Sequence, residues 1–272
     1  MTDTAAAMSD ALTRARRRLA TAARTWFVTA ALGQWAFVAF ILLYFTPPLL
    51  QGDPLAINTK PRITGWAPGD TLGNAQFVLH VFLGALVTAS GILQLVPAVR
   101  RRWPALHRWN GRLFMATAIV ASLSGFYLTW IRGSMLNLPS ALSTSLNGVL
   151  ILVFVALAWR FAWRRDFAAH RRHALRAWVL VNGVWFLRLG IMLAGLGLAP
   201  FGVQMGYDGV VFLGVSYASW IVPLALVQVY LAAEAAPTPA LPRFTAALLF
   251  VLAALTAAGS AAAMAFMWGP YL

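Results

Sequence analysis

The chain has 272 residues, of which 61% are hydrophobic and only 10% are charged, and its formal net charge is +14. Soluble globular domains have about a quarter of their residues charged, so this composition excludes a water-soluble domain and indicates an integral membrane protein. The basic residues lie at the edges of apolar runs, which argues against a nucleic-acid partner, and the absence of cysteine excludes disulfides and thiolate-bound metals.

A basic segment leads into the first apolar run. Arg14 and the arginines at positions 16–18 precede this run, which covers residues 26–46 and ends at Pro47 and Pro48. It is longer than the roughly 7–15 residues of a signal-peptide core, and no small-x-small cleavage site follows it. We therefore predict a basic cytoplasmic tail over residues 1–24, followed by an uncleaved first transmembrane helix.

Apolar runs of about 20 residues, the length that crosses ~30 Å of hydrocarbon, recur along the chain. They predict spans over residues 26–46, 75–97, 109–131, 144–163, 177–199, 209–232 and 244–268. The segment 47–74 is rich in proline and glycine, which predicts an irregular loop. The predicted fold class is all-α, a polytopic transmembrane bundle of about seven helices over residues 25–272.

The distribution of arginine predicts the orientation. With the N-terminus inside, 17 of the 21 basic residues fall on the inner side and three on the outer side. Such an excess is typical of cytoplasmic loops, so we predict an inner (plasma) membrane protein with a cytoplasmic N-terminus and an outer C-terminus. The predicted partners are the lipid bilayer and either anionic lipid headgroups or a small anionic ligand.

Small and polar residues recur at helical spacing in three of the spans, which predicts close contacts between helices. They are His80, Gly84, Val87, Gly91 and Gln94 in the second span, His107, Gly111, Ala118, Ser122 and Gly125 in the third, and Arg176, Gly183, Gly190 and Gly197 around the fifth.

Arg188 falls inside the fifth predicted span, about 16 Å from either interface by helical rise. All seven acidic residues lie at chain ends or in loops, so none is predicted at its depth. A central arginine costs at least ~2.5 kcal/mol and usually faces a partner or a cavity. Arg188 is therefore interpreted either as a structural residue bonded to backbone carbonyls or as the counter-charge of an anionic ligand or cofactor group.

The four histidines suggest a cofactor. His80 lies near the outer end of the second span, His107 begins the third on the inner side, and His170 and His173 fall in the inner loop before the fifth. Two imidazoles at one depth are what a b-type haem requires, so His107 and His170 are the predicted axial, metal-binding ligands. Structural histidines held by hydrogen bonds are the alternative, above all for His80.

Three segments carry a family resemblance. Gly91-Ile92-Leu93-Gln94-Leu95 is followed by His107-Arg108-Trp109-Asn110-Gly111-Arg112 and by His170-Arg171-Arg172-His173-Ala174-Leu175-Arg176. Over residues 75–232 the chain resembles the bacterial membrane proteins grouped as domain of unknown function 2306. The resemblance implies a core of four to five helices whose marked polar positions are His80, His107, His170, Arg176 and Arg188.

The chain departs from the family pattern at several positions. The family usually has Trp-Met where this chain has His173-Ala174, and it tends to have Asn and Glu where this chain has Leu224 and Gln228. A weaker likeness to His-ligated b-type transmembrane cytochromes supports the haem hypothesis at the level of fold.

The functional hypotheses come from three classes. The first is a haem-binding redox protein with His107 and His170 as ligands and Arg176 or Arg188 as propionate partners. The second is a non-enzymatic transporter, or a protein that binds lipid or a small molecule, with a cavity around Arg188. The third is a structural membrane subunit. No nucleophile–base set, phosphate-binding loop or zinc spacing appears in the sequence, which leaves open whether the chain is an enzyme.

Overall fold

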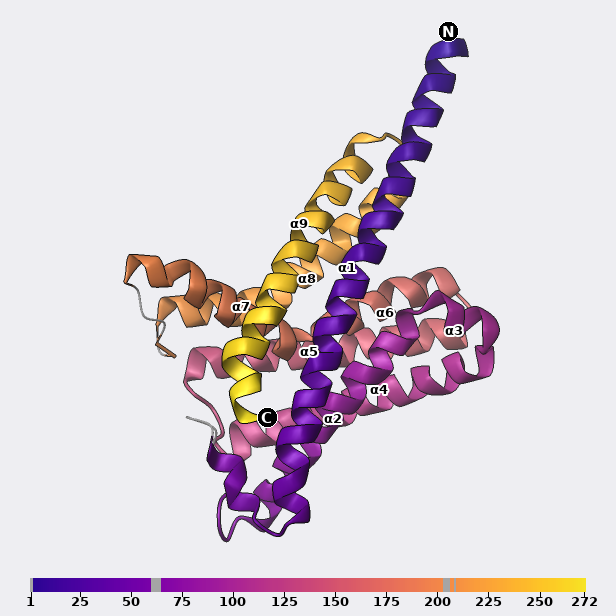
Figure 1. Ribbon diagram of the computed structural model, residues 1–272. Helices are drawn as coiled ribbons and strands as arrows, with labels where there is room; N and C mark the ends of the chain where they lie inside the picture. The colour runs from indigo at the N-terminus through magenta and orange to yellow at the C-terminus, as the bar shows by residue number, and fades with distance from the viewer. Residues whose placement is uncertain (1, 60–64, 203–205, 208) are drawn as a thin grey trace.

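The structure is a computed structural model that describes residues 2–59, 65–202, 206–207 and 209–272. Within these residues the chain is built from helices and contains no strand (Figure 1). Seven helical segments in them are long and apolar enough to cross a membrane, which confirms the predicted all-α, multi-pass bundle.

In chain order the elements are α1 (Thr2–Leu50), the 3-10 helix η1 (Pro54–Thr59), α2 (Thr71–Leu95), α3 (Pro97–Arg102), α4 (Pro104–Phe126), the π-helical turn η2 (Tyr127–Ile131), α5 (Leu138–Trp163), α6 (Phe167–Val181), α7 (Gly183–Leu198), η3 (Ala199–Phe201), α8 (Val210–Ala235), α9 (Ala240–Ala262), the π-helical η4 (Ala263–Trp268) and η5 (Gly269–Tyr271).

Four helices form the central layer, in which α2 packs on α4, α4 on α5 and α5 on α6. Val155 and Trp178 belong to their shared buried core. A side chain at Gly91 would bring its Cβ to 2.9 Å from the Trp178 ring, so the predicted close contact of the second span is confirmed at this position. Asn110 donates a hydrogen bond to the Ser90 carbonyl at 2.8 Å and ties α4 to α2.

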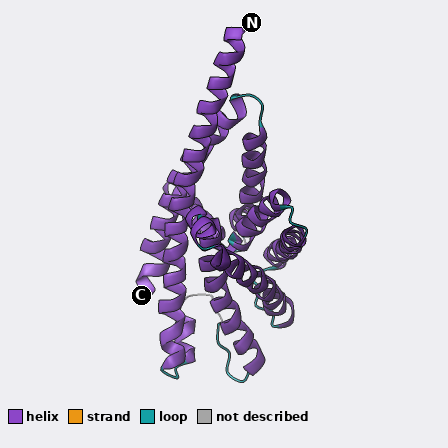
Figure 2. Cartoon of the chain, turned by 90° about the vertical axis from the view of Figure 1, so that its right-hand side faces the viewer, coloured by secondary structure: helices purple, strands orange, loops and turns teal. Residues whose placement is uncertain are grey.

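On one side of this layer, α1 lies beside α9 in both views (Figures 1 and 2), and α7 packs on α9. Side-chain contacts connect these helices and α6. They join Trp26 to Trp178 and Phe37 to Arg188 for α6 and α7, and Gly33 to Ser260 and Phe40 to Trp268 for α9 and η4.

α1 is continuous past residue 24 and includes the described part of the basic segment. Leu19 and Ala22 are buried in a cluster with Leu249 of α9, and the Arg16 guanidinium donates to the Ala236 carbonyl at 3.1 Å. The N-terminal segment is therefore helical and partly packed on the α8–α9 hairpin. The side of the membrane on which it lies stays a prediction.

The fifth predicted span is divided at Asn182, where α6 ends and α7 begins. The Asn182 side chain donates to the Trp178 carbonyl at 2.8 Å, and Asn147 of α5 donates to the Leu180 carbonyl at 3.1 Å. A helix break inside a membrane is tolerated where other groups bind the freed backbone, and here side-chain amides do so. Hydropathy alone predicts one helix because both halves are apolar.

The residues before this span form α6, so the prediction that His170 and His173 lie in a loop was wrong. Asp166 caps the helix, because its Oδ1 accepts a hydrogen bond from the Ala169 amide at 2.9 Å. Arginines interrupt the apolar run here, and an apolar-run criterion does not detect an amphipathic helix that packs one face on α5.

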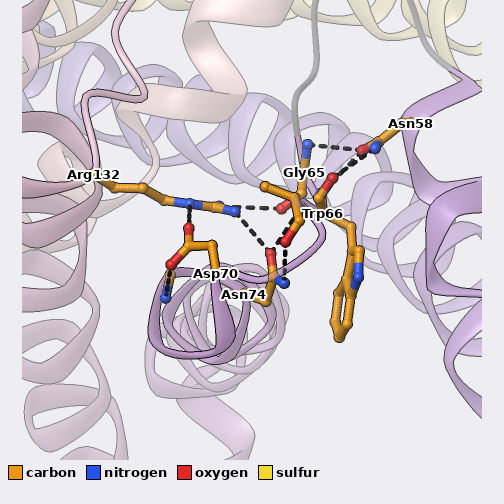
Figure 3. A network of polar contacts seen from close by, with 8 residues as sticks. Asn58, Gly65, Trp66, Asp70, Asn74 and Arg132 are labelled. Carbon is orange, nitrogen blue, oxygen red and sulfur yellow. Dashed lines mark hydrogen bonds and ion pairs between the residues drawn. The ribbon is translucent and has the colours of Figure 1, made fainter.

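Hydrogen bonds hold the segment before α2 at the far end of the bundle (Figure 3). Arg132 donates to Asp70 at 2.8 Å, to Asn74 at 2.8 Å and to the Gly65 carbonyl at 3.1 Å. The Asn58 side chain accepts from the Gly65 amide at 2.9 Å. The predicted irregular loop over residues 47–74 therefore contains the end of α1, η1 and residues that take part in these hydrogen bonds. Residues 60–64 lie outside the described structure.

Candidate functional site at the arginine-rich end

Eleven arginines gather where α2, α3 and α4 join and where α5 joins α6, and these junctions form the arginine-rich end of the bundle. They are Arg100, Arg101, Arg102, Arg108 and Arg112 at the first junction and Arg160, Arg164, Arg165, Arg171, Arg172 and Arg176 at the second. Among the described residues, the five at the first junction form no ion pair with a carboxylate. Uncompensated guanidinium groups at one surface attract anions.

A shallow groove lies at the junction of α3 and α4. It is lined by Arg102, Trp103, Pro104, Ala105, Leu106 and Arg108. Pro104 begins α4 in the first turn, where its missing N–H costs nothing. The side chains of Trp103 and Leu106 are 56% and 49% exposed, so apolar surface lies open between two arginines.

One turn further along α4, Trp109 and Arg112 extend this surface. The Arg112 guanidinium lies 4.6 Å from the centre of the Trp109 ring, and Trp109 is exposed. Tryptophan and arginine side by side are typical of the headgroup level of a bilayer. At this level the indole ring can contact the acyl chains while the guanidinium group stays hydrated.

His107 and His170 lie at this end, in the first turns of α4 and α6. His170 Nδ1 is 2.9 Å from the Ala158 carbonyl, so this nitrogen carries the proton and Nε2 is left as the acceptor. The His107 backbone carbonyl accepts from Gln94 at 2.9 Å, while its ring Nδ1 is buried without a hydrogen-bond partner.

His173 lies one turn further along α6 and has different surroundings. Its ring stacks on Phe161 with a centroid distance of 5.3 Å and an interplanar angle of 4°. Burial lowers the pKa of His173, and the charges of Arg176 and Arg172 lower it further. A neutral imidazole at physiological pH suits the 3.4 Å contact between its Nδ1 and Arg176 Nη1.

Two arginines of α6 are already engaged by α8. Arg176 donates to the Gln228 side-chain oxygen from two nitrogens, at 3.2 and 2.7 Å. Arg171 makes two bonds to Glu234, at 2.7 and 2.9 Å, and this carboxylate raises the pKa of the arginine. Both contacts tie α6 to α8, so Arg176, a predicted propionate partner, already has an acceptor within the chain.

The other two predicted site residues lie elsewhere. His80 is on α2 and its ring faces Gly125 of α4, where an added Cβ would lie 3.2 Å from the ring. Arg188 is on α7, eighteen residues beyond His170, or about 27 Å by helical rise. His107, His170 and Arg176 therefore all lie at the arginine-rich end, whereas His80 and Arg188 do not.

A family model described as "Predicted membrane protein (DUF2306)" matches residues 77–231, more than half of the chain. The chain belongs to the DUF2306 family. No curated protein matches the chain, and no solved structure matches it. The DUF2306 region begins within α2 and ends within α8, so it contains the arginine-rich end and leaves out α1 and α9.

Within the DUF2306 region, sequence analysis assigned no site role to Gln228 or Asn147. Each is a single amide in an apolar run, and each binds a group on a neighbouring helix. A lone amide between apolar residues is the signal that could have found them, because an amide in hydrocarbon needs a partner. The identity of that partner depends on helix packing.

Proposed function

We propose that this DUF2306 protein binds anionic amphiphiles, in the first place anionic phospholipids, at its arginine-rich end. The observation that carries the proposal is the groove between Arg102 and Arg108. The groove is lined by apolar side chains and two arginines, and no carboxylate of the described chain pairs with these arginines. A phosphate on an acyl chain matches both features, since arginine binds phosphate oxygens and the apolar side chains accept the acyl chain.

The proposal assigns the arginine-rich end to the cytoplasmic leaflet of the inner membrane. Anionic lipids give that leaflet a negative surface potential, and each nearby arginine contributes about 1 kcal/mol of attraction. Trp103, Leu106 and Trp109 are exposed in the structure, so they are available to the interfacial region of such a leaflet.

The test uses the detergent-purified protein with phosphatidylglycerol or phosphatidylcholine added in mixed micelles. We expect the anionic lipid to raise the melting temperature more than the zwitterionic lipid. Arg102→Gln with Arg108→Gln should weaken the apparent affinity about thirtyfold, at about 1 kcal/mol per arginine. Arg17→Gln with Arg18→Gln is the matched control, because it removes the same charge from exposed positions on α1. Equal losses of apparent lipid affinity in the two double variants would contradict a localised site.

A second candidate, a b-type haem held by His107 and His170, is favoured by two observations. The bond from His170 Nδ1 to the Ala158 carbonyl is the outer contact that orients an imidazole ligand and leaves Nε2 free for a metal. The buried Nδ1 of His107 has no partner in the chain. When bound, such a haem would supply one-electron transfer, and the two histidines would hold its iron.

The visible spectrum of the purified protein tests this candidate. Low-spin haem with two imidazole ligands would give split bands in the reduced protein. We expect His107→Ala and His170→Ala each to abolish those bands, and His173→Ala, a third histidine at the same end, to keep them. A colourless protein after expression with a haem precursor would eliminate the candidate and leave the lipid proposal untouched.

A further inference from the structure

Three helices, α1, α7 and α9, meet at Gly33, in the part of the bundle that lies beside the central layer. A Cβ added at Gly33 would overlap Ser260 Oγ of α9 and would lie 2.9 Å from Cζ2 of Trp185 on α7. The missing side chain therefore lets a hydroxyl and an indole approach the backbone of α1. This meeting point lies about 11 Å, by helical rise, beyond the level of Trp26.

The polar atoms around this point have no hydrogen-bond partner. Gln34 and Trp185 are fully buried, and neither amide atom of Gln34 nor the indole Nε1 of Trp185 is bonded. Ser260 Oγ is also buried and unbonded. Gln34 lies on the same face of α1 as Ala30 and Phe37, which pack with Trp185 in one buried cluster. Unpaired polar groups inside a membrane each cost several kcal/mol, so a binding partner is expected here.

Arg188 adds a positive charge one turn further along α7. Its guanidinium lies 4.9 Å from the centre of the Phe37 ring, and its Nη1 donates to the Val184 carbonyl at 2.9 Å. None of the ion pairs among the described residues includes Arg188, so no carboxylate of the described chain neutralises it.

The chemistry of these groups selects the kind of ligand. The indole N–H, the hydroxyl, the amide NH2 and the guanidinium are donors, whereas the Gln34 oxygen is the one side-chain group that only accepts. A water molecule would satisfy some donors but would leave the charge uncompensated. A small anion would accept hydrogen bonds from the donors and would also compensate the charge of Arg188. Such charge-assisted hydrogen bonds are about twice as strong as neutral ones.

We propose that Gln34, Trp185, Arg188 and Ser260 form a binding site for a small monovalent anion inside the membrane-spanning bundle. Two of its four residues come from α1 and α9, outside the region that the family model matches. The site is separate from the arginine-rich end and does not depend on the lipid or haem proposals.

The experiment measures the melting temperature of the purified protein at constant ionic strength while sodium gluconate is replaced by sodium chloride or sodium formate. Gluconate is too bulky to enter between packed helices. We expect a saturable rise with at least one of the two small anions, and the two arms separate a halide from a carboxylate ligand. A melting temperature that does not change in either arm would overturn the proposal.

The variants locate the effect. Arg188→Gln and Gln34→Leu should each weaken the apparent affinity at least tenfold, which corresponds to about 1.4 kcal/mol. Arg243→Gln, which removes an exposed arginine at the start of α9, is the control and should leave the response unchanged. If Arg188→Gln does not fold, Ser260→Ala decides, because it keeps the charge and removes one donor. A wild-type response in Ser260→Ala and Gln34→Leu would then refute the site.

Discussion

Arg176 binds Gln228 at a position where the family pattern tends to carry an acid. Two guanidinium nitrogens donate to the amide oxygen, at 2.7 and 3.2 Å, so a carboxylate fits the same place. We expect Gln228→Glu to stabilise the protein by about 0.2–1 kcal/mol at low salt, the range measured for exposed ion pairs. Thermal unfolding should show a higher melting temperature, and the gain should shrink in high salt. Gln228→Leu is the control and should lower the melting temperature; a decrease with Glu at low salt would contradict the pairing.

Asp70, at the opposite end of the bundle, contributes to the stability of the fold in a pH-dependent way. The bond from the Gly73 amide and the bond from Arg132 lower the pKa of this carboxyl. Because the folded pKa lies below the unfolded value of about 3.9, the stabilisation is fully present above that pH and is lost as pH falls through the folded pKa. We expect the melting temperature of Asp70→Asn to lie below that of the parent at pH 7, with the gap closing below about pH 4. Asp10→Asn is the control, since Asp10 and Arg14 are exposed and 3.6 Å apart; a gap that does not change with pH would refute the assignment.

At the level of the helices, the break at Asn182 depends on a side chain from another helix. Asn147 of α5 donates to the Leu180 carbonyl, which has lost its place in the helical ladder. Asn147→Leu should lower the free energy of unfolding by about 0.6–1.7 kcal/mol, the range of side-chain hydrogen bonds measured inside membranes. The measurement is reversible unfolding in mixed micelles. Thr144→Val on the same helix removes only a bond to the Ser140 carbonyl within α5, and should cost less. Equal costs would mean that the break does not depend on Asn147.

The seven spans could be predicted from the sequence because transfer of an apolar run into lipid is a local property of that run. The break at Asn182 could not, since Asn147, which binds the Leu180 carbonyl there, is 33 residues distant from Leu180 along the chain. The basic cluster around Arg108 and the position of His107 near the start of a membrane-spanning helix were predicted in the same local way. Gln34, Trp185 and Ser260 come from three helices, α1, α7 and α9, that are far apart in the sequence. No residue spacing within one helix could therefore predict this site. The helical state of His170 was missed because arginines interrupt the apolar pattern there.

For the whole molecule, the uneven distribution of arginine predicts that the arginine-rich end faces the cytoplasm. The chain contains no cysteine, so single cysteines can be introduced without removing any native one. Ala105→Cys lies in the groove between Arg102 and Arg108, whereas Leu55→Cys and Leu272→Cys lie at the opposite end of the bundle.

A membrane-impermeant maleimide added to spheroplasts should modify the cysteines at positions 55 and 272 and should modify position 105 only after lysis. The physical reason is the free-energy cost of moving basic residues through the bilayer. With the arginine-rich end inside, three basic residues must cross, whereas the opposite orientation requires 17 to cross. The cysteine-free parent is the control for background labelling. Modification of position 105 in intact spheroplasts would invert the orientation and assign the groove between Arg102 and Arg108 to the outer leaflet. Protection of position 272 alone would mean that the last helix, α9 with its π-helical end, does not complete its crossing.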